Sequence, residues 1–176
     1  MRKPAQILCL VALLVVGLAL VAAAQTKPAP KPEGAAASQH TMITPDQLKW
    51  GPAPPSLPPG AQMAVLEGDP TKPGLFAIRA KFPDGYTVAP HWHPTDEHVV
   101  VLSGTFMMGL GDKLDAGSMH SLPAGSFSKI PRRAHHYARA KGETIIQVYG
   151  MGPFVLNYVN PGDDPRKKTT TEKPSR

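Results

Sequence analysis

Histidine is the residue type whose placement carries most chemical information in this chain. Six of the seven histidines lie between residues 91 and 136, in a stretch of short apolar runs. A neutral imidazole is both a frequent ligand of transition metals and a frequent proton-transfer group, so this clustering predicts a metal site or acid–base chemistry. The single cysteine, Cys9, lies near the N-terminus, so no thiol chemistry is expected within the cluster.

Two of these histidines are spaced for a shared role. His91 and His93 are two residues apart, so on an extended strand both side chains leave the same face, with about 6–7 Å between their Cα atoms. Glu97 follows after Pro94-Thr95-Asp96, a break that can return its carboxylate towards the same point, and His136 arrives on a later strand. Three imidazoles and one carboxylate that converge suit one divalent transition metal, Fe, Mn, Ni, Co or Zn.

At these positions the chain resembles the cupin superfamily. The first cupin motif, G-x5-H-x-H-x3-E-x6-G, is matched with every spacing correct by Gly85, His91, His93, Glu97 and Gly104. The second motif, G-x5-P-x-G-x2-H-x3-N, fits at Gly125, Pro131 and His136, with Arg133 in place of its second glycine and Ala140 in place of asparagine. The resemblance implies an all-β, double-stranded β-helix (jelly-roll) barrel, with a metal held inside near one mouth by His91, His93, Glu97 and His136.

The second motif leaves alternatives open. Neighbouring His135 competes with His136, although only one of two successive strand residues can face inward. A rival register that begins at Gly117 puts Ser128 at the histidine position and supplies no ligand. Arg133 at the turn position requires a different turn or a left-handed residue strained by about 1 kcal/mol.

The remaining histidines are expected to lie away from the metal. His98 should face away from the metal by strand alternation, and His120 should be an ordinary, partly exposed residue. Residues two and four positions after Glu97 and His136 point to the same side as these ligands and should line the interior: Val99, Val101, Ala138 and Ala140. Acid–base candidates are few, and they lie on strands where packing is the commoner role: Tyr86, Tyr137, Tyr149, Gln147 and Arg79. Arg132-Arg133 is either a solvated basic turn or a binding point for an anionic group.

Short strands are predicted to carry these residues. The chain has 21 prolines and 16 glycines and no long amphipathic helix. Turns are expected at Pro83-Asp84-Gly85, Ser103-Gly104 and Lys141-Gly142. The predicted strands are 62–67, 75–82, 87–91, 97–102, 105–110, 118–122, 126–130, 135–140, 144–149 and 154–159.

The two ends of the chain suggest export. Residues 1–24 have a basic start, an apolar run and Ala22-Ala23-Ala24, which is typical of a cleaved signal peptide, the alternative being an uncleaved anchor. Residues 25–60 are Pro-rich and are expected to form an extended tether. Residues 61–160 would then be the barrel domain, and residues 161–176 a disordered polar tail. Cys9 would leave with the signal.

Charge excludes one class of partner. The chain has a formal net charge of +6, but residues 41–160 contain ten Lys and Arg and nine Asp and Glu, so the excess belongs to the ends. A nearly neutral barrel has little attraction for a nucleic acid.

The sequence therefore predicts a periplasmic or secreted protein, without a membrane span once the signal is removed, that binds a small-molecule substrate or ligand. For a metal-dependent enzyme of this kind, oxidoreductase (dioxygenase-like) or lyase/isomerase chemistry is expected. The alternative is a cupin that binds or senses a metal or small ligand without turnover. A homodimer through an exposed sheet edge or face is also consistent with the resemblance.

Overall fold

The computed structural model describes residues 40–168 of the chain. The chain divides after His40 into two units, and the description below concerns the second. The predicted signal peptide, the first part of the Pro-rich segment and the last residues of the polar tail lie outside the described residues. No helix within residues 40–168 has the length and apolar character needed to cross a membrane.

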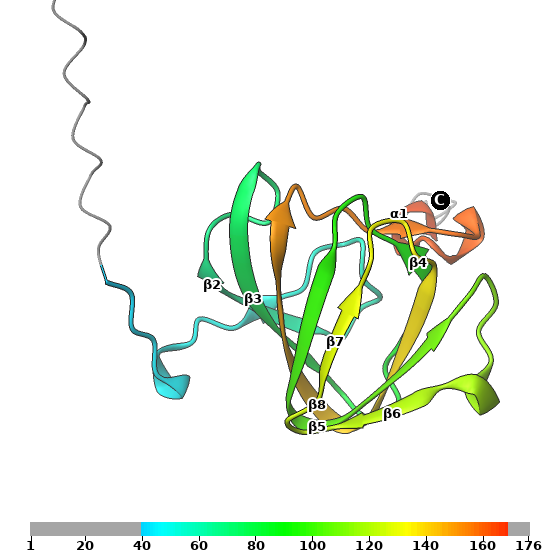
Figure 1. Ribbon diagram of the computed structural model, residues 1–176, viewed down its shortest axis with the longest axis horizontal. Helices are drawn as coiled ribbons and strands as arrows, with labels where there is room; N and C mark the ends of the chain where they lie inside the picture. Colours follow the sequence, from blue (N-terminus) through cyan, green and yellow to red (C-terminus); the bar gives the residue numbers. More distant parts are fainter. Residues whose placement is uncertain (1–39, 169–176) are drawn as a thin grey trace, which may run out of the picture. The chain divides into compact units, whose positions relative to one another are not determined.

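Strands dominate the described part of the chain (Figure 1). In chain order the elements are η1 (Pro45–Gln47), β1 (Gly51–Pro52), β2 (Gln62–Glu67), β3 (Gly74–Phe82), β4 (Thr87–Trp92), β5 (Glu97–Leu110), η2 (Ala116–Ser118), β6 (His120–Pro123), β7 (Phe127–Ile130), β8 (His136–Gly152), β9 (Asn157–Tyr158), η3 (Pro161–Asp163) and α1 (Pro165–Lys168).

The strands form one curled antiparallel sheet in which β8 is the central strand. One path runs β1-β2-β3-β8-β4-β9, while β5 pairs with β8, β6 and β7. The first half of β8 lies between β4 and β5, and the second half lies between β3 and β5. Because one long strand serves both halves, the sheet closes on itself, and the predicted all-β jelly-roll barrel is confirmed (Figure 1).

Two of the predicted turns are bends inside long strands. The chain continues through Ser103-Gly104 as β5 and through Lys141-Gly142 as β8, so four predicted short strands are two long ones. Gly104 has a φ of +73°, and a Cβ there would lie 2.3 Å from the carbonyl oxygen of Glu143. Only glycine permits this close approach. The register of β5 on β8 shifts here, from Ser103 opposite Ile145 to Thr105 opposite Lys141, and pairing resumes beyond the bend.

The core fills the interior of this sheet. Phe82 stacks on Tyr86 with 5.0 Å between ring centroids and on Phe106 with 6.2 Å. The other core residues are apolar side chains contributed alternately by the strands, including Phe76, Ile78, Val88, Val99, Val101, Ile130, Ala138, Ala140, Ile146 and Val148. This period-2 burial is what the sequence alternation predicts.

Candidate metal centre

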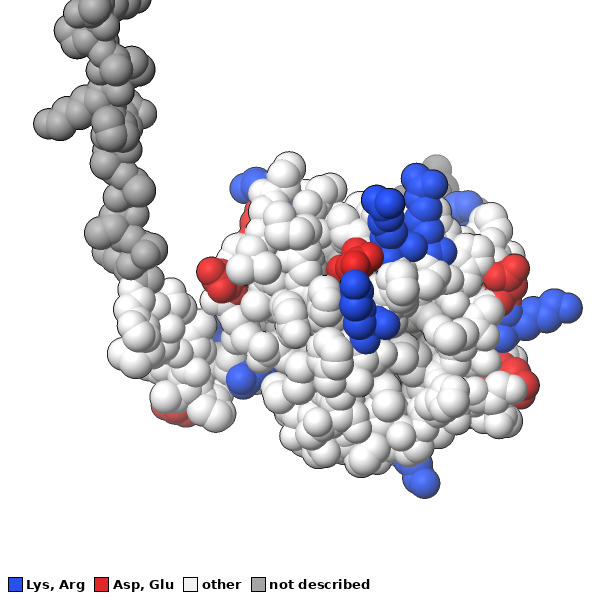
Figure 2. All heavy atoms as spheres, viewed as in Figure 1, with Lys and Arg blue, Asp and Glu red and all other residues white. Residues whose placement is uncertain are grey.

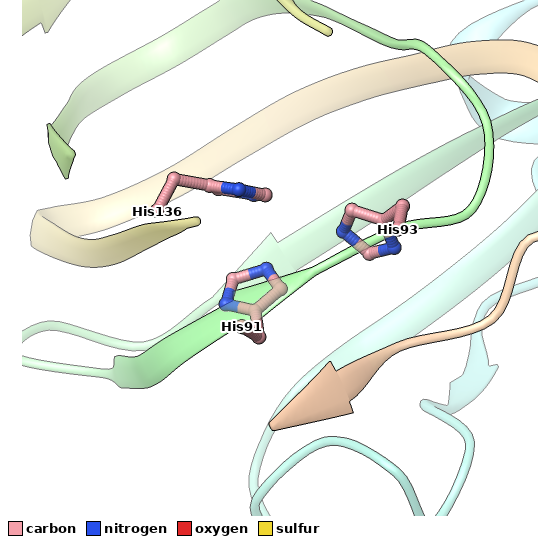
Figure 3. A group of neighbouring side chains, drawn as sticks. All are labelled: His91, His93 and His136. Atoms are coloured by element: carbon pink, nitrogen blue, oxygen red, sulfur yellow. The ribbon is translucent and has the colours of Figure 1, made fainter. Parts of the chain in front are cut away.

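The end of β4 and the start of β8 bring the histidines together. His91 and His136 are directly paired across the two strands, and their ring centroids lie 4.1 Å apart. His93 follows β4 in extended chain, and its ring lies 5.1 Å from that of His91 and 5.4 Å from that of His136. Figure 3 shows the three rings facing a common space. One ring nitrogen from each lies within 4.8 Å of the others, and all three residues are buried.

Backbone carbonyls fix the orientation and tautomer of each ring. In all three, Nδ1 faces a carbonyl oxygen, so Nδ1 carries the proton and donates it: His91 to Ala89 at 2.8 Å, His93 to Val155 at 2.9 Å and His136 to Ala134 at 3.0 Å. When such a ring is neutral, it therefore presents Nε2 as a lone pair. The His93 Nε2 is buried and has no hydrogen-bond partner.

Glu97 completes the group from the first residue of β5. Its Oε2 lies 3.2 Å from Nε2 of His136 and 3.5 Å from Nε2 of His93. The preceding turn is held because Asp96 accepts the backbone N–H of Arg132 at 2.8 Å and pairs with Lys129 at 3.0 Å. These bonds return the carboxylate to the histidines, as the break after His93 predicts.

Burial and mutual charge set the protonation of these groups. Burial lowers the pKa of His91 to about 3, with the neighbouring imidazoles adding to the effect, and burial also lowers the pKa of His93. For Glu97 burial favours the neutral acid, but the hydrogen bond from His136 and the surrounding imidazoles outweigh it, so the pKa falls to about 2. At neutral pH the site thus combines a buried carboxylate with at least two neutral imidazoles.

This donor set fits a divalent transition metal. Imidazole nitrogens and one carboxylate oxygen are borderline to hard ligands of the kind that Fe, Mn, Ni, Co and Zn accept. The unpartnered His93 Nε2 is explained by such an ion, since a buried acceptor without a partner is otherwise unfavourable. The backbone carbonyls supply the outer hydrogen bonds that metal-binding histidines require.

A small apolar cavity adjoins the four residues. Its volume is about 80 Å³, and the side chains around it other than the four are all apolar: Leu57, Ile78, Ala80, Phe82, Val88, Val99, Phe106, Met108, Ile130, Ala138, Ile146, Val148, Phe154 and Leu156. Val99 and Ala138 line it as their parity predicts, while Val101 and Ala140 are buried in the core beyond it. Apolar walls exclude water and strengthen electrostatic interactions inside.

The other histidines lie outside this cavity, as expected. His98 faces the opposite side of β5 and stacks on Tyr149 with 5.0 Å between centroids. His135 is next to His136 but pairs with exposed Asp112 at 2.6 Å. His120 is exposed on β6. Strand alternation therefore selects His136 over His135.

The acid–base candidates are also outside the cavity. Tyr86 and Tyr137 donate their hydroxyls to the backbone oxygens of Pro58 and Asp115 at 2.5 and 3.1 Å, and both act as packing residues. Tyr149 lies on the outer face beside His98. The remaining two candidates, Arg79 and Gln147, contact each other at 3.5 Å, also away from the cavity.

Of the two alternatives for Arg133, a different turn or a strained left-handed residue, the structure has the second. Its φ is +62°, and it is the only non-glycine residue with positive φ in the part of the chain that the structure describes. Its N–H donates to the His93 carbonyl at 2.7 Å, so the turn joins the two histidine-bearing segments. Pro94, Arg132 and Arg133 line a surface hollow of about 350 Å³. Figure 2 shows basic side chains gathered beside an acidic group over β7 and the following turn.

Some residues of the site have no signal in the sequence. The ring of Phe154 stacks on His93 with 4.1 Å between centroids, and the Val155 carbonyl accepts the His93 Nδ1–H. Leu57, from the Pro-rich segment, lines the same cavity. Phe154 lies in a predicted strand that is mostly a loop, so its role depends on a contact 61 residues away in sequence.

Comparisons with known proteins agree with this architecture. Residues 22–156 match the family model described as "Domain of unknown function (DUF4437)". No curated protein sequence matches the chain.

Solved structures share the fold at low identity. A candidate acetylacetone dioxygenase from Methylibium petroleiphilum PM1 is 20% identical, with a TM-score of 0.56 over 72% of this chain and 85% of that chain. The polyketide cyclase RemF from Streptomyces resistomycificus is 16% identical, with a TM-score of 0.56 over 76% and 95%. An RmlC-like cupin from Shewanella frigidimarina NCIMB 400 is 18% identical, with a TM-score of 0.50 over 65% and 91%. The cupin fold predicted from the motifs is thereby confirmed.

Proposed function

Because the chain belongs to the DUF4437 family and has the cupin fold, we propose that it is an exported metal-dependent enzyme that acts on a small molecule. His91, His93, Glu97 and His136 hold one divalent transition metal in this proposal. The observation that carries it is the convergence of three buried imidazoles whose Nδ1 atoms are already bonded to carbonyls, beside a buried carboxylate.

The protein's own groups define what the site can do. A bound divalent metal supplies a Lewis acid with positions open to substrate oxygen atoms. The three carbonyl bonds hold the imidazoles in a fixed geometry, and the apolar walls keep water from the reacting groups. Glu97 is the only group of the cavity, apart from the imidazoles, that can hold or release a proton.

This scarcity of proton-transfer groups narrows the reaction class. Chemistry that needs at most one acid–base group from the protein fits best, which favours oxygenase-type reactions or Lewis-acid lyase and isomerase reactions. The fold relatives named as a candidate dioxygenase and as a cyclase support small-molecule chemistry, although their identity to this chain is too low to transfer an activity.

The same observation favours a second candidate function. A cavity of about 80 Å³ with no polar wall beyond its four ligands also suits a module that binds a metal or small ligand without turnover. Turnover therefore has to be tested separately from metal binding.

Metal content tests the first part of the proposal. Protein purified after export is analysed for bound transition metals, with His136→Gln as the test variant and His135→Gln as its matched control. We expect about one equivalent of metal in the native protein and in H135Q, and a loss of at least about 100-fold in affinity in H136Q. Equal metal binding by both variants contradicts the assignment.

Turnover distinguishes the two candidates. Oxygen consumption and product formation are followed with vicinal diols, diketones and phenols, in the metal-loaded protein and in His93→Ala. Turnover that depends on His93 supports the enzyme, whereas tight binding without any turnover supports the binding module. Export is tested by intact mass, since the mature chain should lack residues 1–24 and so contain no cysteine.

A further inference from the structure

A second cavity lies directly beside the metal cavity. It has a volume of about 320 Å³, against about 80 Å³ for the cavity at the histidines. The two have four lining residues in common: Leu57, Ile78, Phe154 and Leu156. They are therefore adjacent compartments, and the four shared side chains are called the wall below. Phe154 in that wall also stacks on His93.

The larger compartment, called the outer cavity below, is mainly apolar. Its remaining lining residues are Pro54, Ser56, Met63, Pro70, Thr71, Pro153, Val155 and Arg166. Arg166 is the only charged residue among them, and it is paired with Asp164 through two contacts of 2.7 and 2.8 Å. It also donates to the Leu156 carbonyl at 3.3 Å. Because Asp164 compensates the charge of this guanidinium, a charged ligand group gains little net attraction here, whereas a hydrocarbon group finds favourable apolar contacts.

Leu57 is held in the wall by two tyrosines. The segment Ser56–Pro58 accepts the Tyr158 hydroxyl at the Ser56 oxygen, 2.8 Å away, and the Tyr86 hydroxyl at the Pro58 oxygen, 2.5 Å away. Burial raises the pKa of Tyr158 to about 12 and raises that of Tyr86 further, so both remain hydrogen-bond donors at neutral pH. The Pro-rich segment thus contributes a fixed part of the wall.

Size indicates how the two cavities are used. A volume of about 80 Å³ holds only a few non-hydrogen atoms, while cavities that enclose small ligands usually measure about 300–1,000 Å³. We propose that the outer cavity binds an uncharged hydrocarbon arm of a molecule whose oxygen-bearing end occupies the metal cavity. This inference rests on the proposed function for the oxygen-bearing end, but the outer cavity can be tested without metal.

Alkyl hydroxamates test the inference, since they combine a chelating end with an arm of chosen length. Protein loaded with Co(II) is titrated calorimetrically with acetohydroxamate and with its four-, six- and eight-carbon homologues. We expect affinity to rise about threefold to fourfold for each methylene that is buried. Acetohydroxamate that binds with no gain along the series overturns the inference but leaves the metal site intact. Failure of acetohydroxamate to bind contradicts the proposed function.

Variants that fill the outer cavity make the test specific. Thr71→Trp places a ring in the outer cavity from an exposed position with little risk to folding, and Met63→Trp does so from β2. Leu110→Trp, at a residue that is 67% exposed and lines neither cavity, is the matched control. The filled variants should bind acetohydroxamate normally and lose the gain with chain length, while L110W should retain it.

A ligand without a chelating group tests the outer cavity independently of the metal site. The alcohol 1-hexanol carries the arm without a chelating end, and its binding to metal-free protein is followed by ligand-observed NMR. Binding that T71W and M63W abolish supports the outer cavity, whatever the outcome of the metal experiments. No binding to the native protein, or equal binding to the filled variants, overturns it.

Discussion

Replacement of Glu97 by glutamine should affect the metal-free and metal-bound proteins in opposite directions. In the metal-free protein the buried Glu97 carboxylate, with its pKa lowered to about 2, lies 3.2 Å from the His136 Nε2. In Glu97→Gln an amide of the same shape replaces this carboxylate, so a buried charged group becomes a buried neutral group that can still hydrogen-bond to His136.

The magnitudes follow from the burial of the pair. Exchange of buried charged groups for neutral groups of similar volume is commonly neutral or stabilising by about 1–4 kcal/mol. We therefore expect metal-free E97Q to be as stable as the native protein or up to about 2 kcal/mol more stable. Loss of a charged ligand should weaken metal binding at least about 100-fold, and this removes about 2.7 kcal/mol of metal-dependent stabilisation at saturation.

The assay is urea denaturation followed by tryptophan fluorescence, with EDTA and with excess Co(II), at pH 8. Co(II) absorption reports binding directly. Glu143→Gln, at an exposed position of β8, is the matched control and should change neither quantity. If E97Q lost 3–5 kcal/mol without metal, the carboxylate would be a structural partner of the histidines and the reasoning would be wrong. Unchanged Co(II) affinity would exclude Glu97 as a ligand.

Three further predictions concern the turn, the strand packing and pH. Arg133→Gly should leave the free energy of unfolding unchanged or raise it by up to about 1 kcal/mol, because the left-handed strain is relieved. Arg132→Gly, the control, should lower it by about 0.5–1 kcal/mol. Equal urea midpoints for the two variants would contradict this. Gly109→Ala should cost about 1–3 kcal/mol, since the new Cβ would lie 2.2 Å from the Tyr137 ring, and an unchanged melting temperature would refute that packing. Burial lowers the His91 pKa to about 3, so between pH 6.5 and 3 the unfolded chain binds a proton that the folded chain does not. The urea midpoint of the metal-free protein should therefore fall as the pH drops below about 6.5. A midpoint that does not change with pH would contradict a buried neutral His91 ring.

The local content of the fold follows from the sequence. Strand alternation and glycine spacing predict β2 with its observed limits, and His91 and Glu97 lie on predicted strands, near the end of β4 and at the start of β5. The same alternation predicts that His98 and His135 face away from the metal cavity, as observed. The arginine in place of a motif glycine left two alternatives, a different turn or a strained left-handed residue, and the observed positive φ of Arg133 selects the second.

Pairing over long distances is what the sequence could not predict. Ser103-Gly104 has the composition of a turn, but β8 bends beside it, so β5 pairs with β8 again after a shift in register. Local propensity records where a chain can bend, and only the partner strand decides whether it must separate there.

For the site, too, some features could be predicted from the sequence and others could not. The barrel family and the residue types that converge could be predicted from the sequence, because those features depend on short spacing and on the alternation of strand residues. The folded chain was needed to show that a carbonyl 62 residues away fixes the His93 ring, and that Leu57 and Phe154 lie between two adjacent apolar cavities. Backbone carbonyls are the same at every position and apolar side chains are interchangeable in a pattern, so such contacts leave no mark in the sequence until the chain is folded.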